Sequence, residues 1–257
     1  MSLNVICMKW GTKYSSEYVN KLYSMVARNL SVPFRFVCFT DDAGGIKDGI
    51  EIYGLPSVQI PDGSPERGWR KLTVFGETEA QLKGRCLFLD LDVVIVGGLD
   101  QFYEVDSTFC LAFDEKKKKS KIGNSSVFLF EALQFKDILN NFNQNAERIL
   151  KTYRNEQAYL SDMMEKKDKL TFFPKEWCPS FKYHCIPKFP LNFLFAPKVP
   201  ENSKIILFHG KPEPIEMDVE KTHWLFQFTS MSRKPSIEAM PSCAMTSLTS
   251  SSRISAA

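Results

Sequence analysis

The sequence predicts one α/β domain with a mixed, mostly parallel sheet and helices on both of its faces. Three observations support this class. Over the first two-thirds of the chain, short apolar runs typical of strands alternate with segments whose apolar residues recur at helical spacing. These helical segments are long enough to connect parallel strands, as in βαβ units. A length of 257 residues, of which 44% are hydrophobic and 25% charged, suits one large domain with a substantial core.

The first part of the chain is expected to contain three strands and two helices. The strands are the apolar runs Asn4–Met8, Phe34–Phe39 and Ile50–Tyr53. Between the first two strands, a helix is expected to begin after an N-cap at Ser15 or Ser16 and to end before Pro33. A second helix is predicted over Trp69–Leu82, with Gly84 as its C-cap.

The pattern is less regular further along the chain. Arg85–Val96 is the most apolar stretch and predicts a buried strand that only two aspartates interrupt. A long helix is expected to start near Phe135, and another is expected over Glu156–Met164. Further strands are expected at Phe109–Phe113, Val127–Phe130 and Lys204–Phe208. Residues 174–214 contain eight of the 14 prolines, which predicts an extended, aromatic-rich segment over the sheet. The domain is expected to span residues 1–230, because residues 231–257 are Ser-rich and predict a disordered tail.

Charge and composition exclude several classes of protein. The 33 basic and 30 acidic residues leave a net charge of +3, which is too small for a dedicated nucleic-acid-binding protein. No segment approaches the roughly 18 consecutive apolar residues of a membrane span, and the amino-terminal residues resemble a strand, not a signal peptide. The seven cysteines include no CxxC pair, which predicts buried free thiols in a reducing compartment. The protein is therefore expected in the cytoplasm, either free or at the inner face of the membrane.

An Asp-x-Asp motif is the strongest functional signal in the sequence. Asp90 and Asp92 flank Leu91 at the carboxyl end of the expected strand. Residues two apart in a strand share a face, so both carboxylates are expected on the same side. Open α/β sheets bind ligands at this edge. Two adjacent carboxylates repel each other unless a cation lies between them, and their hard oxygens suit Mg²⁺ or Mn²⁺. Two merely solvated aspartates would be unusual within so apolar a run.

The motif supports two chemistries. In glycosyltransferases of the GT-A fold it holds a metal that bridges to the diphosphate of a sugar nucleotide. In haloacid-dehalogenase-like phosphatases the first aspartate, here Asp90, is a nucleophile and the second is a general acid. The phosphatase motif normally closes the first strand of its domain, whereas Asp90 follows several βα elements. Its position therefore favours the glycosyltransferase. A catalytically inactive module that binds a sugar nucleotide or glycan is the third interpretation.

Roughly residues 4–228 resemble GT-A glycosyltransferases, in particular those similar to family 8. The resemblance rests on the order of five segments around the motif: Cys7-Met8-Lys9-Trp10, Phe39-Thr40-Asp41-Asp42, Gly68-Trp69-Arg70-Lys71-Leu72, Asn124-Ser125-Ser126-Val127-Phe128 and Phe208-His209-Gly210-Lys211-Pro212. It implies a GT-A fold with a Rossmann-like nucleotide-binding half. It also implies metal-dependent transfer of a sugar from a nucleotide-diphosphate donor, expected to be a UDP-sugar, to a hydroxyl of a glycan or lipid-linked acceptor.

The resemblance implies a role for individual residues. The metal ligands would be Asp90, Asp92 and His209. The residues that would contact the base, ribose, phosphates or sugar of the donor are Met8, Lys9, Trp10, Tyr14, Asp41, Asp42, Arg70, Lys71, Leu91, Asn124, Gly210 and Lys211. Lys9-Trp10 departs from the small polar residues usual in the family. Glu156 and Gln157 stand where the family often has Asp-Gln beside the anomeric carbon, so both are candidate catalytic residues.

Several of these residues also have structural explanations. His209 could be a structural histidine at a strand end, and Arg70 and Lys71 could form a solvated helix face. Glu156 could serve the first turn of its helix, where the helix dipole favours a carboxylate. Asn124 could serve a turn.

The stereochemical course is open in the sequence. An inverting enzyme needs a carboxylate base at the acceptor hydroxyl. The candidate bases are Asp114, Glu115, Glu156 and Asp162. Similarity to family 8 favours retention of configuration, which needs no such base.

Two further groups of residues concern the partners. Flat side chains of the proline-rich segment are candidate platforms for an acceptor sugar, or members of the core: Trp177, Phe181, Tyr183 and His184. The basic residues Lys116–Lys119 and Lys121 form either a solvated loop or a mobile flap that attracts an anionic donor or an acidic lipid surface. The expected partners are thus a nucleotide-sugar donor, an acceptor and, peripherally, a membrane, with no nucleic acid.

Overall fold

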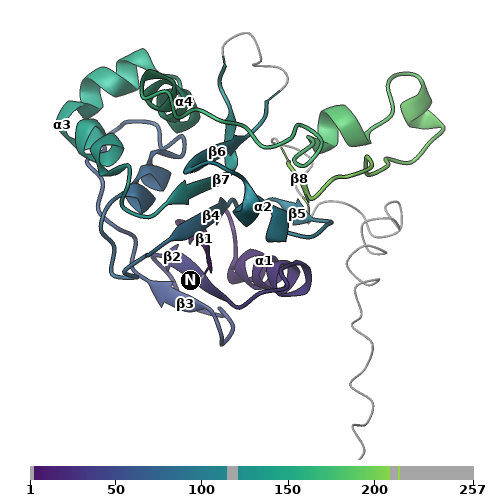
Figure 1. The fold of residues 1–257 in the computed structure, drawn as a ribbon, viewed down its shortest axis with the longest axis horizontal. Coiled ribbons are helices and arrows are strands. Elements are labelled where there is room, and N and C mark those ends of the chain that lie inside the picture. Colours follow the sequence, from purple (N-terminus) through teal and green to yellow (C-terminus); the bar gives the residue numbers. More distant parts are fainter. Residues whose placement is uncertain (1–2, 115–120, 209–213, 215–257) are drawn as a thin grey trace, which may run out of the picture.

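A six-stranded sheet forms the centre of the structure, a computed structural model that describes residues 3–114, 121–208 and 214. The strands lie in the order β3-β2-β1-β4-β7-β6 (Figure 1). Their bounds are β1 Leu3–Lys9, β2 Phe34–Thr40, β3 Glu51–Tyr53, β4 Arg85–Leu89, β6 Phe109–Ala112 and β7 Asn124–Glu131. A separate antiparallel pair consists of β5 (Val94–Ile95) and β8 (Ile205–Ile206).

One strand of the six-stranded sheet runs against the others. β1 pairs in parallel with β2 and β4, and β2 pairs in parallel with β3. β7 is antiparallel to both of its neighbours, β4 and β6. The prediction of a mixed, mostly parallel sheet is confirmed. Because β7 is reversed, its first residues lie at the edge where the neighbouring strands end.

Helices cover both faces of the sheet, as predicted (Figure 1). α1 (Ser16–Asn29) and α2 (Asp100–Glu104) pack on one face, and this face forms the first core. η1 (Trp69–Phe75), α3 (Lys136–Thr152) and α4 (Glu156–Lys166) pack on the other face and form the second core. Side chains alternate along each strand, so Leu87 enters the first core and Phe88 the second. The second core is rich in aromatic rings, among them Phe88 and Phe128, which stack at 4.8 Å.

The helix predicted over Trp69–Leu82 is shorter and tighter than expected. It is the 3₁₀ helix η1, and it ends at Phe75. Gly76 follows so close to α3 that a Cβ at this position would lie 2.7 Å from Cδ2 of Leu139. Gly84 is not a helix C-cap, because it lies directly before β4 with a φ of 73°. Helical spacing in the sequence did not reveal this close contact with α3.

The strand expected over Arg85–Val96 is also interrupted. β4 ends at Leu89, Leu91 and Asp92 form a turn, and β5 begins at Val94. The alternation of side chains in a strand therefore does not bring the two aspartates together, contrary to expectation. The turn does so instead, and the backbone N–H of Asp90 donates to the carbonyl of Ser126 in β7 at 2.8 Å.

The proline-rich segment is irregular, as predicted, but it stands away from the sheet in Figure 1 and does not lie over it, contrary to expectation. Its only helical parts among the described residues are short turns, η3 (Phe181–Cys185) and η4 (Leu191–Phe193). Its root is attached to the strand that follows, because the N–H groups of Lys204 and Ile205 donate to the carbonyl of Trp177 at 2.9 Å.

Other expectations from composition concern single residues and the chain ends. The six cysteines of the described part are all free and buried, as predicted. Within the described ranges, no helix combines the length and apolar character needed to cross a membrane. Ser15 occupies the N-cap of α1 without a side-chain hydrogen bond. The expected tail, residues 231–257, lies outside the described residues, and the domain limit at residue 230 stays a prediction.

Candidate active site

The predicted site residues gather at the edge of the sheet where the parallel strands end. They lie on the segments that follow β1, β2 and β4, on η1 and at the start of α4. The reversed strand β7 begins at this edge and contributes Asn124 and Ser125. Five or more separate segments therefore meet here, as expected for a ligand site in an open α/β sheet.

Lys71 is the buried centre of this cluster. Its Nζ lies 2.7 Å from Oδ2 of Asp90 and 3.5 Å from Oε1 of Glu156. The same atom donates to the carbonyl of Ser125 at 3.4 Å and lies 5.6 Å from the ring centre of Phe88. Burial alone would lower the pKa of Lys71, but the negative charges of Asp90 and Glu156 outweigh it and raise the pKa. The ammonium therefore stays charged, and the interpretation of Lys71 as part of a solvated helix face is wrong.

Glu156 begins α4, and its side chain is only 6% exposed. The hydroxyl of Ser125 donates to Oε1 of this carboxylate. On the other side, Gly68 leaves room for it, because a Cβ on Gly68 would lie 2.7 Å from Oε2. The cap of α4 is Asn155, whose Oδ1 accepts from the N–H of Ala158 at 3.3 Å. The Glu156 carboxylate thus belongs to the polar cluster and not to the helix cap.

Asp92 lies beside Asp90 in the turn and contacts the loop after β1. The hydroxyl of Tyr14 donates to its Oδ2 at 2.8 Å. Burial and the negative charge of Asp90 raise the pKa of the Asp92 carboxyl, and the hydrogen bond from Tyr14 offsets only part of this. The two carboxylates are therefore close enough to repel each other.

This pair of carboxylates fits a hard divalent cation. A cation between Asp90 and Asp92 would offset both the burial and the repulsion that raise the pKa of Asp92, and oxygen ligands suit Mg²⁺ or Mn²⁺. Among residues 3–114 and 121–208, no group of three or more His, Cys, Asp or Glu side chains could hold a metal. Further ligands would come from a bound diphosphate or from His209, which lies outside the described residues.

Hydrogen bonds connect the loop after β1 with the loop after β2, where the base and ribose are expected to bind. The Nζ of Lys9 donates to the carbonyl of Asp42 at 3.3 Å, and the N–H of Gly11 donates to Oδ2 of Asp41 at 2.8 Å. Met8 is buried in the second core, and Trp10 is half-buried against the same core. Lys9 and Asp41 therefore determine the shape of these loops.

Two predicted residues make their contacts away from the cluster. Arg70 pairs with Glu66, with 3.1 Å between Nε and Oε1. Asp162 accepts hydrogen bonds from Tyr153 and Lys166. Burial would raise the pKa of Asp162, but these hydrogen bonds outweigh it, so the pKa is lowered. Neither side chain contacts Asp90, Asp92 or Glu156 in the described structure.

Some of the remaining predicted residues are described by the structure, and the others lie outside the described ranges. Leu91 is buried in the first core between the aspartates, and Gln157 is half-buried on the first turn of α4. Lys121 pairs with Glu165 at 2.6 Å. Several predicted residues lie outside the described part of the chain: Glu115, Lys116–Lys119, His209, Gly210 and Lys211.

A cavity of about 690 Å³ opens between the start of β7 and the proline-rich segment. Asp114, Asn124, Ser180, Tyr183 and His184 are among the residues that line it. The hydroxyl of Ser180 is buried without a hydrogen-bond partner among the described residues. The N–H of Ser180 donates to Nδ1 of His184 at 2.9 Å, which makes Nε2 the donor of the neutral ring. The cavity is thus lined by an imidazole and a carboxylate beside a tyrosine ring.

The two other aromatic side chains of this segment pack in the core. The rings of Phe181 and Phe208 stack at 4.8 Å, and the ring of Trp177 lies 5.0 Å from that of Phe102. They support the wall of the cavity, whereas Tyr183 and His184 face it. A second cavity, of about 740 Å³ between Gln59–Pro61 and α3, contains none of the predicted site residues.

Sequence reasoning missed the contacts of Ser125 and Gly68 with Glu156. Both residues belong to segments that were noted for the resemblance, but no role was derived for either. A weak signal was present, because Ser125 is a polar residue at the start of a buried strand. Gly68 has a φ of 82°, and nothing in the sequence around it indicates that it lies against Glu156.

Comparison with known proteins identifies the fold. No protein-family model and no curated sequence matches the chain. Among solved structures, the galactosyltransferase LgtC in complex with donor and acceptor sugar analogues matches with a TM-score of 0.60 and 14% identity, over 89% of this chain and 95% of that chain. An active-site mutant of LgtC matches with a TM-score of 0.59 and 14% identity, over the same shares of the two chains.

A second glycosyltransferase gives a similar result. The apo form of GlyE from Streptococcus pneumoniae TIGR4 matches with a TM-score of 0.59 and 12% identity, over 90% of this chain. The chain spans 61% of the length of GlyE. The protein therefore has the fold of the GT-A glycosyltransferases, as the resemblance implied.

Gly68→Ala tests the close contact between Gly68 and the carboxylate of Glu156. The positive φ should cost the variant about 1–2 kcal/mol of unfolding free energy. The contact with the carboxylate should cost roughly 1–3 kcal/mol more. Gly63→Ala is the matched control, because Gly63 has a φ of 75° but nothing within 4 Å of an added Cβ. Equal losses in urea unfolding for the two variants would contradict the proposed contact.

A double-mutant cycle tests the buried ion pair. Lys71→Met should lower the unfolding free energy by about 3–5 kcal/mol, because it leaves buried carboxylates unpaired. Adding Glu156→Gln should recover part of this loss, with a coupling energy of about 1–3 kcal/mol. The control is the more exposed pair Lys167–Asp137, which is 2.6 Å apart and should couple by less than about 1 kcal/mol. Strict additivity at Lys71 and Glu156 would rule out their interaction.

Proposed function

We propose that the protein is a metal-dependent glycosyltransferase. It would move a sugar from a nucleotide-diphosphate donor, expected to be a UDP-sugar, to a hydroxyl of a glycan or lipid-linked acceptor. The observation that carries the proposal is the pair of carboxylates, Asp90 and Asp92, at the strand ends of a GT-A fold. The raised pKa of Asp92 marks this pair as a site that a cation would stabilise.

The donor would bind at the strand ends, with its diphosphate toward Asp90 and Asp92. A bound Mn²⁺ or Mg²⁺ would act as a Lewis acid and stabilise the negative charge of the leaving diphosphate. Lys211 is proposed to neutralise part of the same charge, and His209 to complete the set of metal ligands. The base and ribose would bind near the loops after β1 and β2, which the hydrogen bonds of Lys9 and Asp41 connect.

Lys71 and Glu156 are proposed as positioning residues. The ammonium of Lys71 holds one oxygen of Asp90, which leaves the other oxygen available for a cation. Glu156 and Ser125 hold the ammonium in place from the opposite side. Tyr14 orients Asp92 in the same way through a hydrogen bond at 2.8 Å. Such fixed neighbours keep ligand side chains in one geometry.

The acceptor is proposed to enter the cavity beside Asn124. Asn124 and Ser125 are consecutive in β7, so their side chains lie on opposite faces, one toward the cavity and one toward Glu156. The imidazole of His184, which lines this cavity, would hydrogen-bond acceptor hydroxyls. The ring of Tyr183 would pack against the apolar face of a sugar.

Retention of configuration is the favoured course. An inverting reaction needs a carboxylate base that can reach the acceptor. Among the described candidate bases, Asp114 is the one that lines the cavity. The phosphatase alternative is not favoured, because Asp90 follows the fourth strand of a sheet with the GT-A order.

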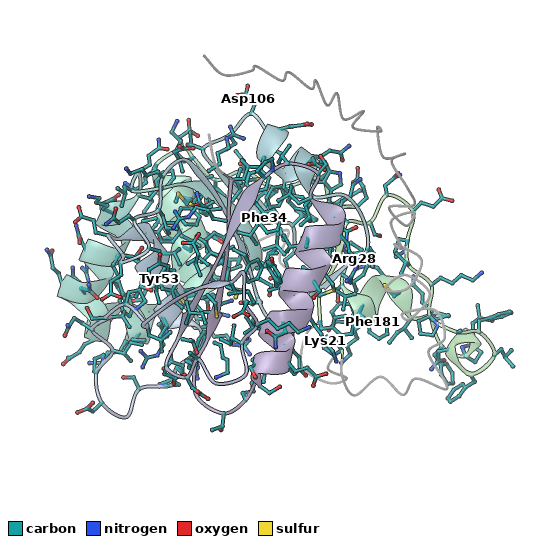
Figure 2. All side chains as sticks on the ribbon, turned by 90° about the horizontal axis from the view of Figure 1, so that it is seen from below. Lys21, Arg28, Phe34, Tyr53, Asp106 and Phe181 are labelled. Carbon is teal, nitrogen blue, oxygen red and sulfur yellow. The ribbon has the colours of Figure 1, made fainter. Side chains whose placement is uncertain are left out.

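Asp92→Asn tests the donor site. Calorimetry with the full chain should detect binding of UDP in the presence of Mn²⁺. The variant should weaken this binding by more than about tenfold, because it removes a charged ligand. Asp106→Asn is the control, since Asp106 is exposed before β6 at the opposite edge of the sheet (Figure 2). If Asp92→Asn binds as the unchanged protein does, the proposed site is wrong.

The anomeric configuration of the product tests the reaction. With an active donor, NMR should show that the transferred sugar keeps its configuration. An inverted product, together with loss of turnover in Asp114→Asn, would overturn retention. Donor binding without turnover over a panel of donors and acceptors would instead support the inactive binding module.

A further inference from the structure

The most exposed apolar side chains of the described protein gather in one loop. Phe189, Phe193 and Leu194 are 81%, 75% and 75% exposed. Five of the nine exposed large hydrophobic side chains in the described ranges lie between residues 189 and 195. The others are scattered and at most 42% exposed, which is ordinary for a protein surface. We call residues 188–198 the apolar loop.

Hydrogen bonds within the apolar loop satisfy several of its backbone N–H groups. The N–H of Phe193 donates to the carbonyl of Pro190 at 3.1 Å, and those of Leu194 and Phe195 donate to the carbonyl of Leu191 at 3.0 and 2.9 Å. These bonds matter because an unpaired backbone N–H is costly to move out of water. The tip of the loop can therefore leave water with these N–H groups already satisfied.

The root of the apolar loop is firmly attached to the core. The N–H of Lys198 donates to the carbonyl of Cys185 at 2.9 Å, and Cys185 is buried. In Figure 2, Phe181 lies on the side of the molecule from which this segment projects. This hydrogen bond thus connects the root of the apolar loop to a buried residue.

Exposed basic residues flank the apolar loop in the sequence. Lys188 and Lys198 stand at its two ends, and Lys182 precedes it; all three side chains are exposed. No acidic residue occurs between Glu176 and Glu201 in the sequence. An apolar, aromatic tip inside a group of lysines is the pattern that favours the surface of an anionic bilayer.

We propose that the apolar loop docks the protein onto an anionic lipid bilayer. Phe189, Phe193 and Leu194 would enter the boundary between headgroups and acyl chains, and the lysines would contact acidic headgroups. A second copy of the chain fits this surface less well. Stable protein interfaces need roughly 20–30 residues a side, and two such tips would bring like charges together.

Docking in this way would orient the proposed active site. Tyr183, His184 and Lys188 line the cavity, and the same segment continues into the apolar loop. The cavity would therefore face the membrane surface, where the head group of a lipid-linked acceptor lies. This consequence rests on the proposed function, whereas docking itself can be measured without donor or acceptor.

Vesicle flotation with the full chain tests the docking. The unchanged protein should float with vesicles of phosphatidylcholine and phosphatidylglycerol at least about tenfold more than with phosphatidylcholine alone. Phe193→Ser with Leu194→Ser should lower the bound fraction at least about tenfold, because it removes the apolar tip without changing the charge. Val32→Ser is the control, since Val32 is 42% exposed elsewhere, and it should change nothing.

A second pair of variants separates charge from apolar contact. Lys182→Gln with Lys198→Gln should reduce flotation with anionic vesicles. Lys47→Gln should not, because Lys47 is an exposed residue between β2 and β3, outside the apolar loop. Unchanged flotation in the serine variant, or no flotation of the unchanged protein, would overturn the proposal.

Fluorescence tests whether the apolar loop is free to dock. Subtracting the emission spectrum of the unchanged protein from that of Phe193→Trp gives the emission of the new tryptophan. This emission should be that of a water-exposed ring, and its maximum should move to shorter wavelength when anionic vesicles are added. If emission is already at short wavelength without vesicles, a second copy or another segment covers the loop, and the proposal is wrong. Sedimentation would then identify which of the two it is.

Discussion

The buried ammonium of Lys71 is the constraint on which the site depends. A charge removed from water is costly unless opposite charges and hydrogen-bond acceptors surround it. Asp90, Glu156 and the carbonyl of Ser125 meet this need, and each comes from a different element. Gly68 makes room for the arrangement by having no side chain beside Glu156. Four elements, η1, β7, α4 and the turn after β4, must therefore be in place together before the cluster is stable.

The reversed strand β7 joins the two halves of the proposed site. In a fully parallel sheet, residues at the start of a strand would lie at the edge away from the ligand. Reversal brings Asn124 and Ser125 to the edge with Asp90 and Asp92. Alternation along the strand then turns Ser125 to the polar cluster and Asn124 to the cavity. One short run of backbone thus connects the carboxylate pair with the proposed acceptor space.

The many aromatic residues of the chain divide by environment. Rings such as Phe88 and Phe128 stack in the second core, and the ring of Phe88 forms an apolar floor under Lys71. This floor strengthens the electrostatic interactions above it, because charges are poorly screened next to apolar groups. A few rings remain outside the cores, in the apolar loop, where they are 55–81% exposed. The same residue type therefore stabilises the fold in one place and forms a surface for a partner in the other.

The sequence by itself determined most of the strands and helices, the fold class and the Asp-x-Asp motif. These follow from local periodicity, since burial on one face of an element repeats every two residues in a strand and about 3.6 in a helix. Only the tertiary structure decided that Lys71 is buried and that a turn brings Asp90 and Asp92 together. It alone decided that η1 ends at Phe75, against α3. Each of these depends on contacts between segments far apart in the chain, which a local pattern does not contain.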